Sequence, residues 1–153
     1  MEQTEDYILI DGQGQWWYEG NQIIHPEVLA LFKSSLIVDP AGGNYFIDYK
    51  GKRAPVRVEK TPFFIHDIEV KRNGEGDPLE IILVLDDGTR EILVPSTLAL
   101  DDSGALRARV KNDRFAARCL PTAHFRLAEL LREDEGVFFL VLAGHKYRLE
   151  SRT

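Results

Sequence analysis

The chain has 153 residues, is 44% hydrophobic and 29% charged, and carries a formal net charge of -6. A chain of this length can bury a sizeable core, and its composition excludes a disordered or collagen-like protein. The acidic balance disfavours nucleic acid as a partner, because affinity for phosphates comes largely from Lys and Arg. Cys119 is the single cysteine, so neither an internal disulfide nor a thiolate metal cluster can form.

The first residues contain Glu2, Glu5 and Asp6, and they lack a basic segment and a long apolar run. Neither a signal peptide nor a membrane span fits this pattern. We therefore expect a cytoplasmic protein that has no membrane partner.

The N-terminal part of the chain predicts a hairpin, a helix and a second hairpin. β-prone runs at 7–10 and 15–18 flank a Gly-rich turn, which is typical of a hairpin. Pro26 predicts a helix start, because the first N–H of a helix has no partner in the helix. Apolar spacing predicts one buried helix face, made of Val28, Leu31, Phe32, Ser35 and Leu36. A second hairpin is expected from 45–49 and 56–58.

The central part of the chain reads as strands. Alternation predicts that Phe64, His66, Ile68 and Val70 share one apolar face. Runs at 79–85 and 90–94 flank Asp-Asp-Gly-Thr, which is a strong hairpin signal. Two further strands, 106–110 and 115–119, are separated by Asn-Asp.

The end of the chain resembles its beginning. Pro121 predicts a second helix, and its residues Ala123, Leu127, Leu130 and Leu131 have the same offsets from proline as Val28, Phe32, Ser35 and Leu36 have from Pro26. We therefore predict an α+β fold that is antiparallel and β-rich, with two short helices. Repeated hairpin–helix–hairpin units would surround a central β-meander, with boundaries at 1–62 and 63–153, and the two parts can pack as one compact domain.

The order and spacing of several short segments resemble the bacterial domain-of-unknown-function family 1285. These segments are Asp11-Gly12, Trp16-Trp17-Tyr18, Ile23, Leu31-Phe32, Tyr45-Phe46, Thr61-Pro62-Phe63-Phe64, Ala117-Arg118 and Phe125–Leu130. The resemblance spans nearly the whole chain and implies a repeated α+β fold, a ligand-binding or signalling role and no established activity. The chain departs from the family's Ser-Gly-Gly-type turn near its end, where it has Leu142-Ala143-Gly144-His145.

Residue types with catalytic or metal chemistry are scattered. Trp17 stands where a dinucleotide fingerprint that begins at Gly12 would need glycine. The spacing of the four histidines is not that of metal ligands, so we expect no metal and no cofactor. If a metal site did exist, His25 and His124 would be its natural ligand pair, because both stand near the start of a predicted helix. We expect His66 to bond a backbone group, and His124 and His145 to face solvent. Cys119 is expected to be a small buried hydrophobe.

Two features favour binding. Arg107, Arg109 and Lys111 alternate along one strand, and Arg114 and Arg118 on the next can extend them into an anion site. The alternative is a solvated sheet face, because Asp101, Asp102 and Asp113 are near in sequence. Three consecutive aromatic residues, Trp16, Trp17 and Tyr18, cannot all face one way. At least one should be in the core, and the outward ring either binds a partner or packs in the hairpin.

Three functions follow from these observations. The first is a non-enzymatic ligand- or partner-binding module of sensory type that holds a small anion. Its candidate site residues are Trp16, Trp17, Tyr18, Arg107, Arg109, Lys111, Arg118 and His124. The second is a hydrolase or lyase that uses His25, His66 or His124 with carboxylates in a cleft between the halves. The third is a structural homodimer.

Overall fold

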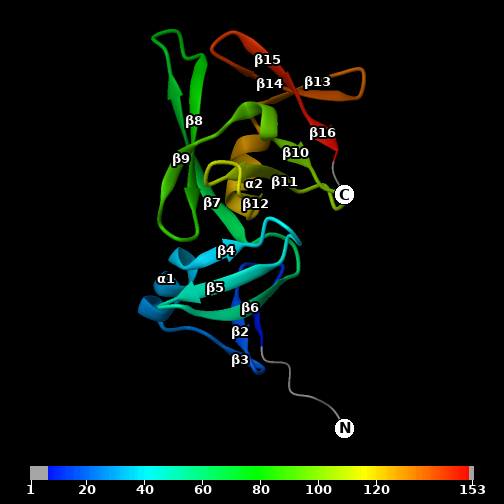
Figure 1. Cartoon of the computed structure of the whole chain (residues 1–153). Coiled ribbons are helices and arrows are strands. Elements are labelled where there is room, and N and C mark those ends of the chain that lie inside the picture. The colour runs from blue at the N-terminus through cyan, green and yellow to red at the C-terminus, as the bar shows by residue number, and fades with distance from the viewer. Residues whose placement is uncertain (1–6, 152–153) are drawn as a thin grey trace. The chain divides into compact units, whose positions relative to one another are not determined.

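The computed structural model describes residues 7–151, which form two compact units that divide between Pro62 and Phe63 (Figure 1). The acidic residues Glu2, Glu5 and Asp6 lie outside the described residues. No helix within residues 7–151 is long and apolar enough to cross a membrane.

The N-terminal unit contains one helix and a six-stranded sheet with the order β3-β2-β1-β6-β5-β4 (Figure 1). The first hairpin is confirmed, and so is the second. β1 and β6 pair in parallel, so the first strand lies beside a strand far away in the sequence. The elements are β1 (Ile8–Ile10), β2 (Trp16–Tyr18), β3 (Asn21–Gln22), α1 (Pro26–Ser34), β4 (Leu36–Val38), β5 (Tyr45–Tyr49) and β6 (Lys52–Val58).

The core of the N-terminal unit lies on one face of this sheet. Ile8, Ile10 and Trp16 are nearly fully buried there, and the rings of Trp16 and Phe32 lie 6.3 Å apart between centroids. The predicted buried helix face is wrong in its extent, because no residue of α1 is fully buried. α1 also ends at Ser34, so Leu36 belongs to β4.

The C-terminal unit contains a seven-stranded sheet with the order β16-β10-β11-β12-β7-β8-β9, and a three-stranded sheet with the order β13-β14-β15. A single turn of 3-10 helix, η1 (Pro95–Thr97), precedes β10. The remaining elements are β7 (Phe63–Arg72), β8 (Pro78–Leu85), β9 (Arg90–Ile92), β10 (Ala99–Leu100), β11 (Leu106–Val110), β12 (Phe115–Cys119), α2 (Pro121–Ala128), β13 (Leu131–Asp134), β14 (Val137–Leu142), β15 (His145–Arg148) and β16 (Glu150–Ser151).

α2 packs directly against β7 and β12. Its residues Ala123 and Leu127 are 0% exposed. Nearby, Phe63 and Phe115 meet edge to face with centroids 5.1 Å apart, a favourable geometry for aromatic rings. The prediction that Leu130 and Leu131 extend α2 is wrong, because the helix ends at Ala128 and Leu131 begins β13.

One turn design recurs at three hairpins, in residues 11–15, 73–77 and 101–105. The first residue is Asp or Asn, and its Oδ1 accepts backbone N–H bonds of 2.9 Å from the residues two and four positions later. The fourth residue is glycine with positive φ, for example +84° at Gly104. Side-chain bonding of this kind is why Asp, Asn and Gly favour turns.

Two parts of the predicted architecture need correction. The fold is α+β, but its sheets are mixed, because β1 with β6, β12 with β7, and β10 with β16 pair in parallel. The predicted repeat of hairpin, helix and hairpin is not confirmed. The strands that follow α1 join a six-stranded sheet, whereas β13, β14 and β15 after α2 form a separate sheet and β16 returns to the seven-stranded one.

Candidate functional site

The N-terminal unit contains a pocket of about 400 Å³ between α1 and the sheet. α1 contributes Val28 and Phe32, and strands β1, β2 and β6 form the opposite wall. This volume lies within the range of small-molecule sites, which are concave and mainly apolar. The lining residues are Tyr7, Ile8, Tyr18, Ile23, Val28, Phe32, Arg53, Ala54 and Pro55.

The three consecutive aromatic residues of β2 have three environments. Trp16 is 1% exposed and lies in the core. Trp17 points to the other face, where its Nε1 donates a hydrogen bond of 2.9 Å to Asp11 Oδ2. Tyr18 is 39% exposed and lines the pocket. The expectation that the rings divide between two faces is therefore confirmed, and Tyr18 is the ring that a ligand can reach.

Trp16 carries an unsatisfied polar group. Its Nε1 is buried and has no hydrogen-bond acceptor among the residues that the structure describes. A buried donor without an acceptor costs about 1–3 kcal/mol, so the Trp16 indole is held in place by packing rather than by a polar contact.

The polar groups of the pocket lie at its rim. The Arg53 side chain is 57% exposed and donates through Nε to Asp48 Oδ2 at 3.3 Å. Arg57 lies outside the lining, and its guanidinium stacks 4.3 Å from the centroid of the Tyr7 ring. The pocket therefore offers an apolar interior and one cationic group at its edge.

The predicted basic strand lies in the C-terminal unit, where carboxylates neutralise most of it. Arg109 Nε donates to Asp113 Oδ1 at 2.9 Å, and Arg118 Nε donates to Asp101 Oδ2 at 3.0 Å. Arg107 lies opposite Arg118 in the β11–β12 register. The Arg107 guanidinium forms no hydrogen bond or ion pair within residues 7–151.

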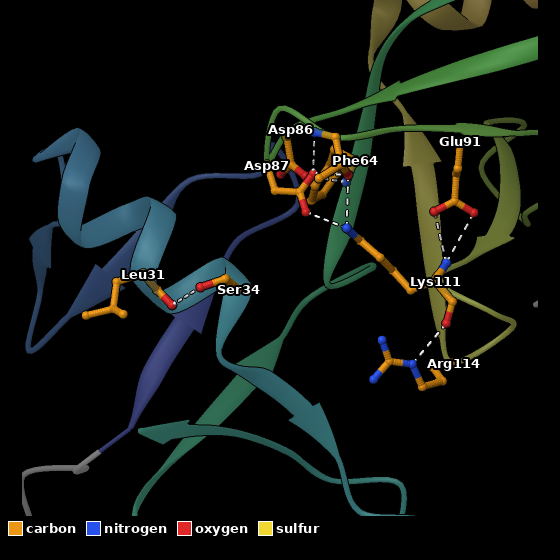
Figure 2. Close-up of polar contacts among 9 residues, drawn as sticks. Leu31, Ser34, Phe64, Asp86, Asp87, Glu91, Lys111 and Arg114 are labelled. Atoms are coloured by element: carbon orange, nitrogen blue, oxygen red, sulfur yellow. Dashed lines mark hydrogen bonds and ion pairs between the residues drawn. The ribbon is translucent and has the colours of Figure 1, made fainter. Parts of the chain in front are cut away.

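Lys111 is the centre of a polar network at the turn between β11 and β12 (Figure 2). Its Nζ donates to Asp87 Oδ2 at 2.6 Å and to Thr89 Oγ1 at 2.9 Å, and its backbone N–H donates to the Glu91 carboxylate. Arg114 Nε donates to the Lys111 carbonyl at 3.0 Å. The lysine is thus a structural clamp between two turns.

The same network holds a strained backbone in place. Residues 111–113 all have positive φ, between 56° and 63°, and none of them is glycine. Such residues are uncommon and persist only where their surroundings fix them. The clamp on Lys111 and the Arg109–Asp113 pair supply that constraint.

The carboxylates that accept these bonds have lowered pKa values. Burial alone would raise the pKa of Asp101, but hydrogen bonds from Ser103, the Ala105 N–H and Arg118 outweigh burial and hold it well below its usual range. For Asp87, burial again opposes bonds from Lys111 and Thr89, and the net pKa shift is downward. Both groups therefore stay ionised as partners of cations.

The histidines and the cysteine form no catalytic cluster. His25 occupies the N-cap position of α1 in the N-terminal unit, and its side chain makes no capping hydrogen bond. His66 is exposed, because a β-bulge between Ile65 and Asp67 removes it from the apolar face where we expected it. No group of three or more His, Cys, Asp or Glu residues within 7–151 could hold a metal.

His124 is half-buried rather than solvent-facing. Its Nδ1 accepts the Leu106 N–H at 3.4 Å, so it links α2 to β11. Burial raises the pKa of the Cys119 thiol to about 12 against a smaller opposing effect of Arg118. The expectation that Cys119 is a buried hydrophobe is confirmed.

The predicted site residues therefore do not share one unit. Trp16, Trp17 and Tyr18 belong to the N-terminal unit, and the basic residues and His124 belong to the C-terminal unit. Sequence reasoning missed most of the pocket, including Ile23 and Val28. The sequence contained one signal for the pocket: the apolar face of α1 carries bulky residues that a short helix cannot bury completely.

Comparisons with known proteins identify the fold. No family model matches the sequence, and no curated protein matches it. A crystal structure of a DUF1285 family protein from Silicibacter pomeroyi DSS-3 is similar, with a TM-score of 0.76 and 22% identity over 93% of this chain and 78% of that one. A second, from Shewanella baltica OS155, has a TM-score of 0.63 and 20% identity over 83% and 94% of the two chains. The resemblance inferred from the sequence is confirmed at the level of structure: the chain has the fold of the DUF1285 family proteins.

Proposed function

We propose that the protein is a non-enzymatic binding module whose N-terminal unit takes a small organic molecule into the pocket beneath α1. One observation carries this proposal: the apolar face of α1 covers a space of about 400 Å³ instead of closing onto the sheet. Val28 and Phe32 remain only half-buried there. An apolar ligand would complete their burial, at about 25 cal/mol for each Å² removed from water.

The lining indicates the chemical class of the ligand. Tyr7, Tyr18 and Phe32 supply aromatic walls, and Arg53 at the rim is the cationic residue of the lining. Guanidinium and carboxylate groups form short charge-assisted hydrogen bonds. The best fit is an organic acid with an aromatic or aliphatic body and one carboxylate. Its body would supply most of the affinity, because the exposed Arg53 is well solvated.

Isothermal titration calorimetry with aryl and medium-chain carboxylic acids tests the proposal. Val28→Trp fills the pocket and should abolish binding. Leu31→Trp is the matched control. It places the same ring on α1, but Leu31 is 36% exposed and lies outside the pocket lining, so this variant should retain binding. The Leu31 carbonyl accepts the Ser34 hydroxyl at 2.9 Å (Figure 2) and the Ser35 N–H at 3.0 Å, and both are backbone-acceptor contacts that a change of the Leu31 side chain leaves in place.

The carboxylate contact has its own control. Arg53→Gln should weaken the binding of the acids by up to about fivefold, which corresponds to the upper end of the range for an exposed ion pair, and it should leave the binding of their primary amides unchanged. Wild-type protein that takes up none of the acids, or Val28→Trp that binds them unchanged, would refute the pocket as the site.

The other expected functions gain less support. None of His25, His66 and His124 lines a described pocket, so no observation favours a hydrolase or lyase. The homodimer stays a prediction. Ile92, which is 55% exposed on edge strand β9, would be a natural contact for it, and sedimentation as a monomer at micromolar concentration would contradict it.

A further inference from the structure

The three-stranded sheet β13-β14-β15 has one buried and one outward face. Along β14, Leu140 and Leu142 are 0% and 4% exposed. Val137, Phe139 and Val141 alternate with them and are half-buried, so they point to the opposite face. The outward face of this small sheet therefore carries a row of three apolar side chains.

Cations from the two flanking strands surround this row. In the register, Arg132 of β13 and Arg148 of β15 lie on either side of Phe139. Lys146 lies opposite Val141, and its Nζ stands 4.2 Å from the centroid of the Phe139 ring. We call these six residues the cationic face: Arg132, Val137, Phe139, Val141, Lys146 and Arg148.

The charges of the cationic face are not neutralised locally. Arg132, Lys146 and Arg148 are exposed, and none forms an ion pair with a carboxylate in the described part of the chain. Asp134, opposite Val137 at the end of the sheet, is the one acidic residue whose position in the register places it on this face.

The predicted basic strand differs from the cationic face in the pairing of its charges. There, Arg109, Lys111 and Arg118 each have a carboxylate partner, although the chain as a whole has a net charge of -6. A patch that keeps an excess of positive charge in an acidic protein is complementary to an acidic partner.

We propose that the cationic face binds an acidic segment of a partner protein. Acidic side chains would meet Arg132, Lys146 and Arg148, while an aliphatic or aromatic side chain of the segment would cover Phe139 and its two valine neighbours. The flanking arginines stem from strands two spacings apart, about 10 Å, so one short extended segment can reach both.

Two neighbouring hollows extend the face. A groove of about 1000 Å³ includes Arg132 and Val141 in its lining, together with the acidic residues Asp77 and Glu129. A smaller one of about 550 Å³ includes Val137 and Arg148, together with Glu150. A segment laid along β14 thus has room at both ends. A long nucleic acid is the poorer fit, because the acidic remainder of the protein would repel its phosphates.

The test measures fluorescence anisotropy of a labelled synthetic peptide, about as long as β14, in which Glu alternates with Phe and Val. Wild-type protein should bind it, and added salt should weaken the binding, because exposed charges are screened. Arg132→Glu with Arg148→Glu should weaken binding about tenfold or more, because like charges would then meet. Phe139→Thr, with the charges intact, should also weaken it.

The matched control is Lys50→Glu with Lys52→Glu. It makes the same change in net charge at exposed residues of the β5–β6 turn in the other unit, and it should leave the affinity unchanged. Equal loss in this control would show a general charge effect and overturn the proposal. Absence of salt-dependent binding by the folded wild-type protein would also overturn it, as would tighter binding of a thymidine oligonucleotide than of the peptide.

Discussion

α1 and α2 both begin at a proline in the first position, yet their packing differs. α2 buries Ala123 and Leu127 completely against its sheet, whereas no residue of α1 is fully buried. The residues at matching offsets explain the difference, because alanine in α2 admits close approach and Val28 in α1 does not. Helices with similar starts can therefore serve as a core element in one unit and as the wall of a pocket in the other.

The largest effect is expected from Leu127→Ala, which should lower the free energy of unfolding by about 2–5 kcal/mol, the cost of a cavity in a closed core. Phe32→Ala in α1 should cost less, about 1–2 kcal/mol, although it removes more atoms, because Phe32 is only half-buried. Urea unfolding followed by circular dichroism measures both. Phe125→Ala, at a residue 67% exposed on α2, is the control, and a larger cost for Phe32 than for Leu127 would break the comparison.

The turn shared by residues 11–15, 73–77 and 101–105 occurs in both units. Of the three first residues, only Asp101 also forms a buried ion pair, and its side chain is 5% exposed. Asp101→Asn should destabilise the protein by about 2 kcal/mol at pH 7, the value for a hydrogen bond to a charged group. The pKa of Asp101 is lowered in the folded state. Its stabilising contribution is therefore complete above about pH 4, the unfolded value, and is lost as the pH falls toward the folded pKa.

Urea midpoints measured from pH 7 down to about pH 3, across the unfolded pKa of aspartate, check this prediction. The wild-type midpoint should fall more steeply than that of Asp101→Asn. Asp102→Asn, at the exposed neighbour in the same turn, should follow the wild type. Parallel curves for Asp101→Asn and the wild type would mean that the ion pair adds nothing to stability.

The smallest effect concerns the turn between β7 and β8. Gly76 has a φ of +86°, whereas Gly74 has no strained φ and no atom within 4 Å of an added Cβ. Gly76→Ala should cost about 1 kcal/mol through its left-handed backbone, and Gly74→Ala should stay within about 0.5 kcal/mol of the wild type. Thermal unfolding by calorimetry distinguishes the two, and equal costs would show that the glycine in the fourth position is not required by its φ.

Local signals in the sequence were sufficient for the hairpins. The Asp-Asp-Gly-Thr turn and its flanking strands are confirmed, because turn chemistry acts between neighbours in the chain. Apolar spacing could not predict where the two helices end, because Leu36 and Leu131 continue a helical pattern but are the first residues of strands. A strand that directly follows a helix carries buried residues of its own, and these imitate another helical turn.

Contacts between distant segments were beyond local patterns. The parallel pairing of Ile8 with Val56 and of Phe63 with Ala117 depends on strands far apart in the chain. The charges show the same limit. Alternation correctly placed Arg107 and Arg109 on one face, but the partner of Arg118 comes from the turn after β10, and Arg132 meets its neighbours only through the register of β14.

The two indoles of β2 give the protein a natural optical label. Both tryptophans of the chain, Trp16 and Trp17, lie in the N-terminal unit, one sealed in the core and the other bonded to the Asp11 carboxylate. Intrinsic emission excited at the red edge of indole absorption therefore reports on that unit alone. Melting of the C-terminal unit would be silent in this channel, so the order in which the two units unfold can be read from one unlabelled sample.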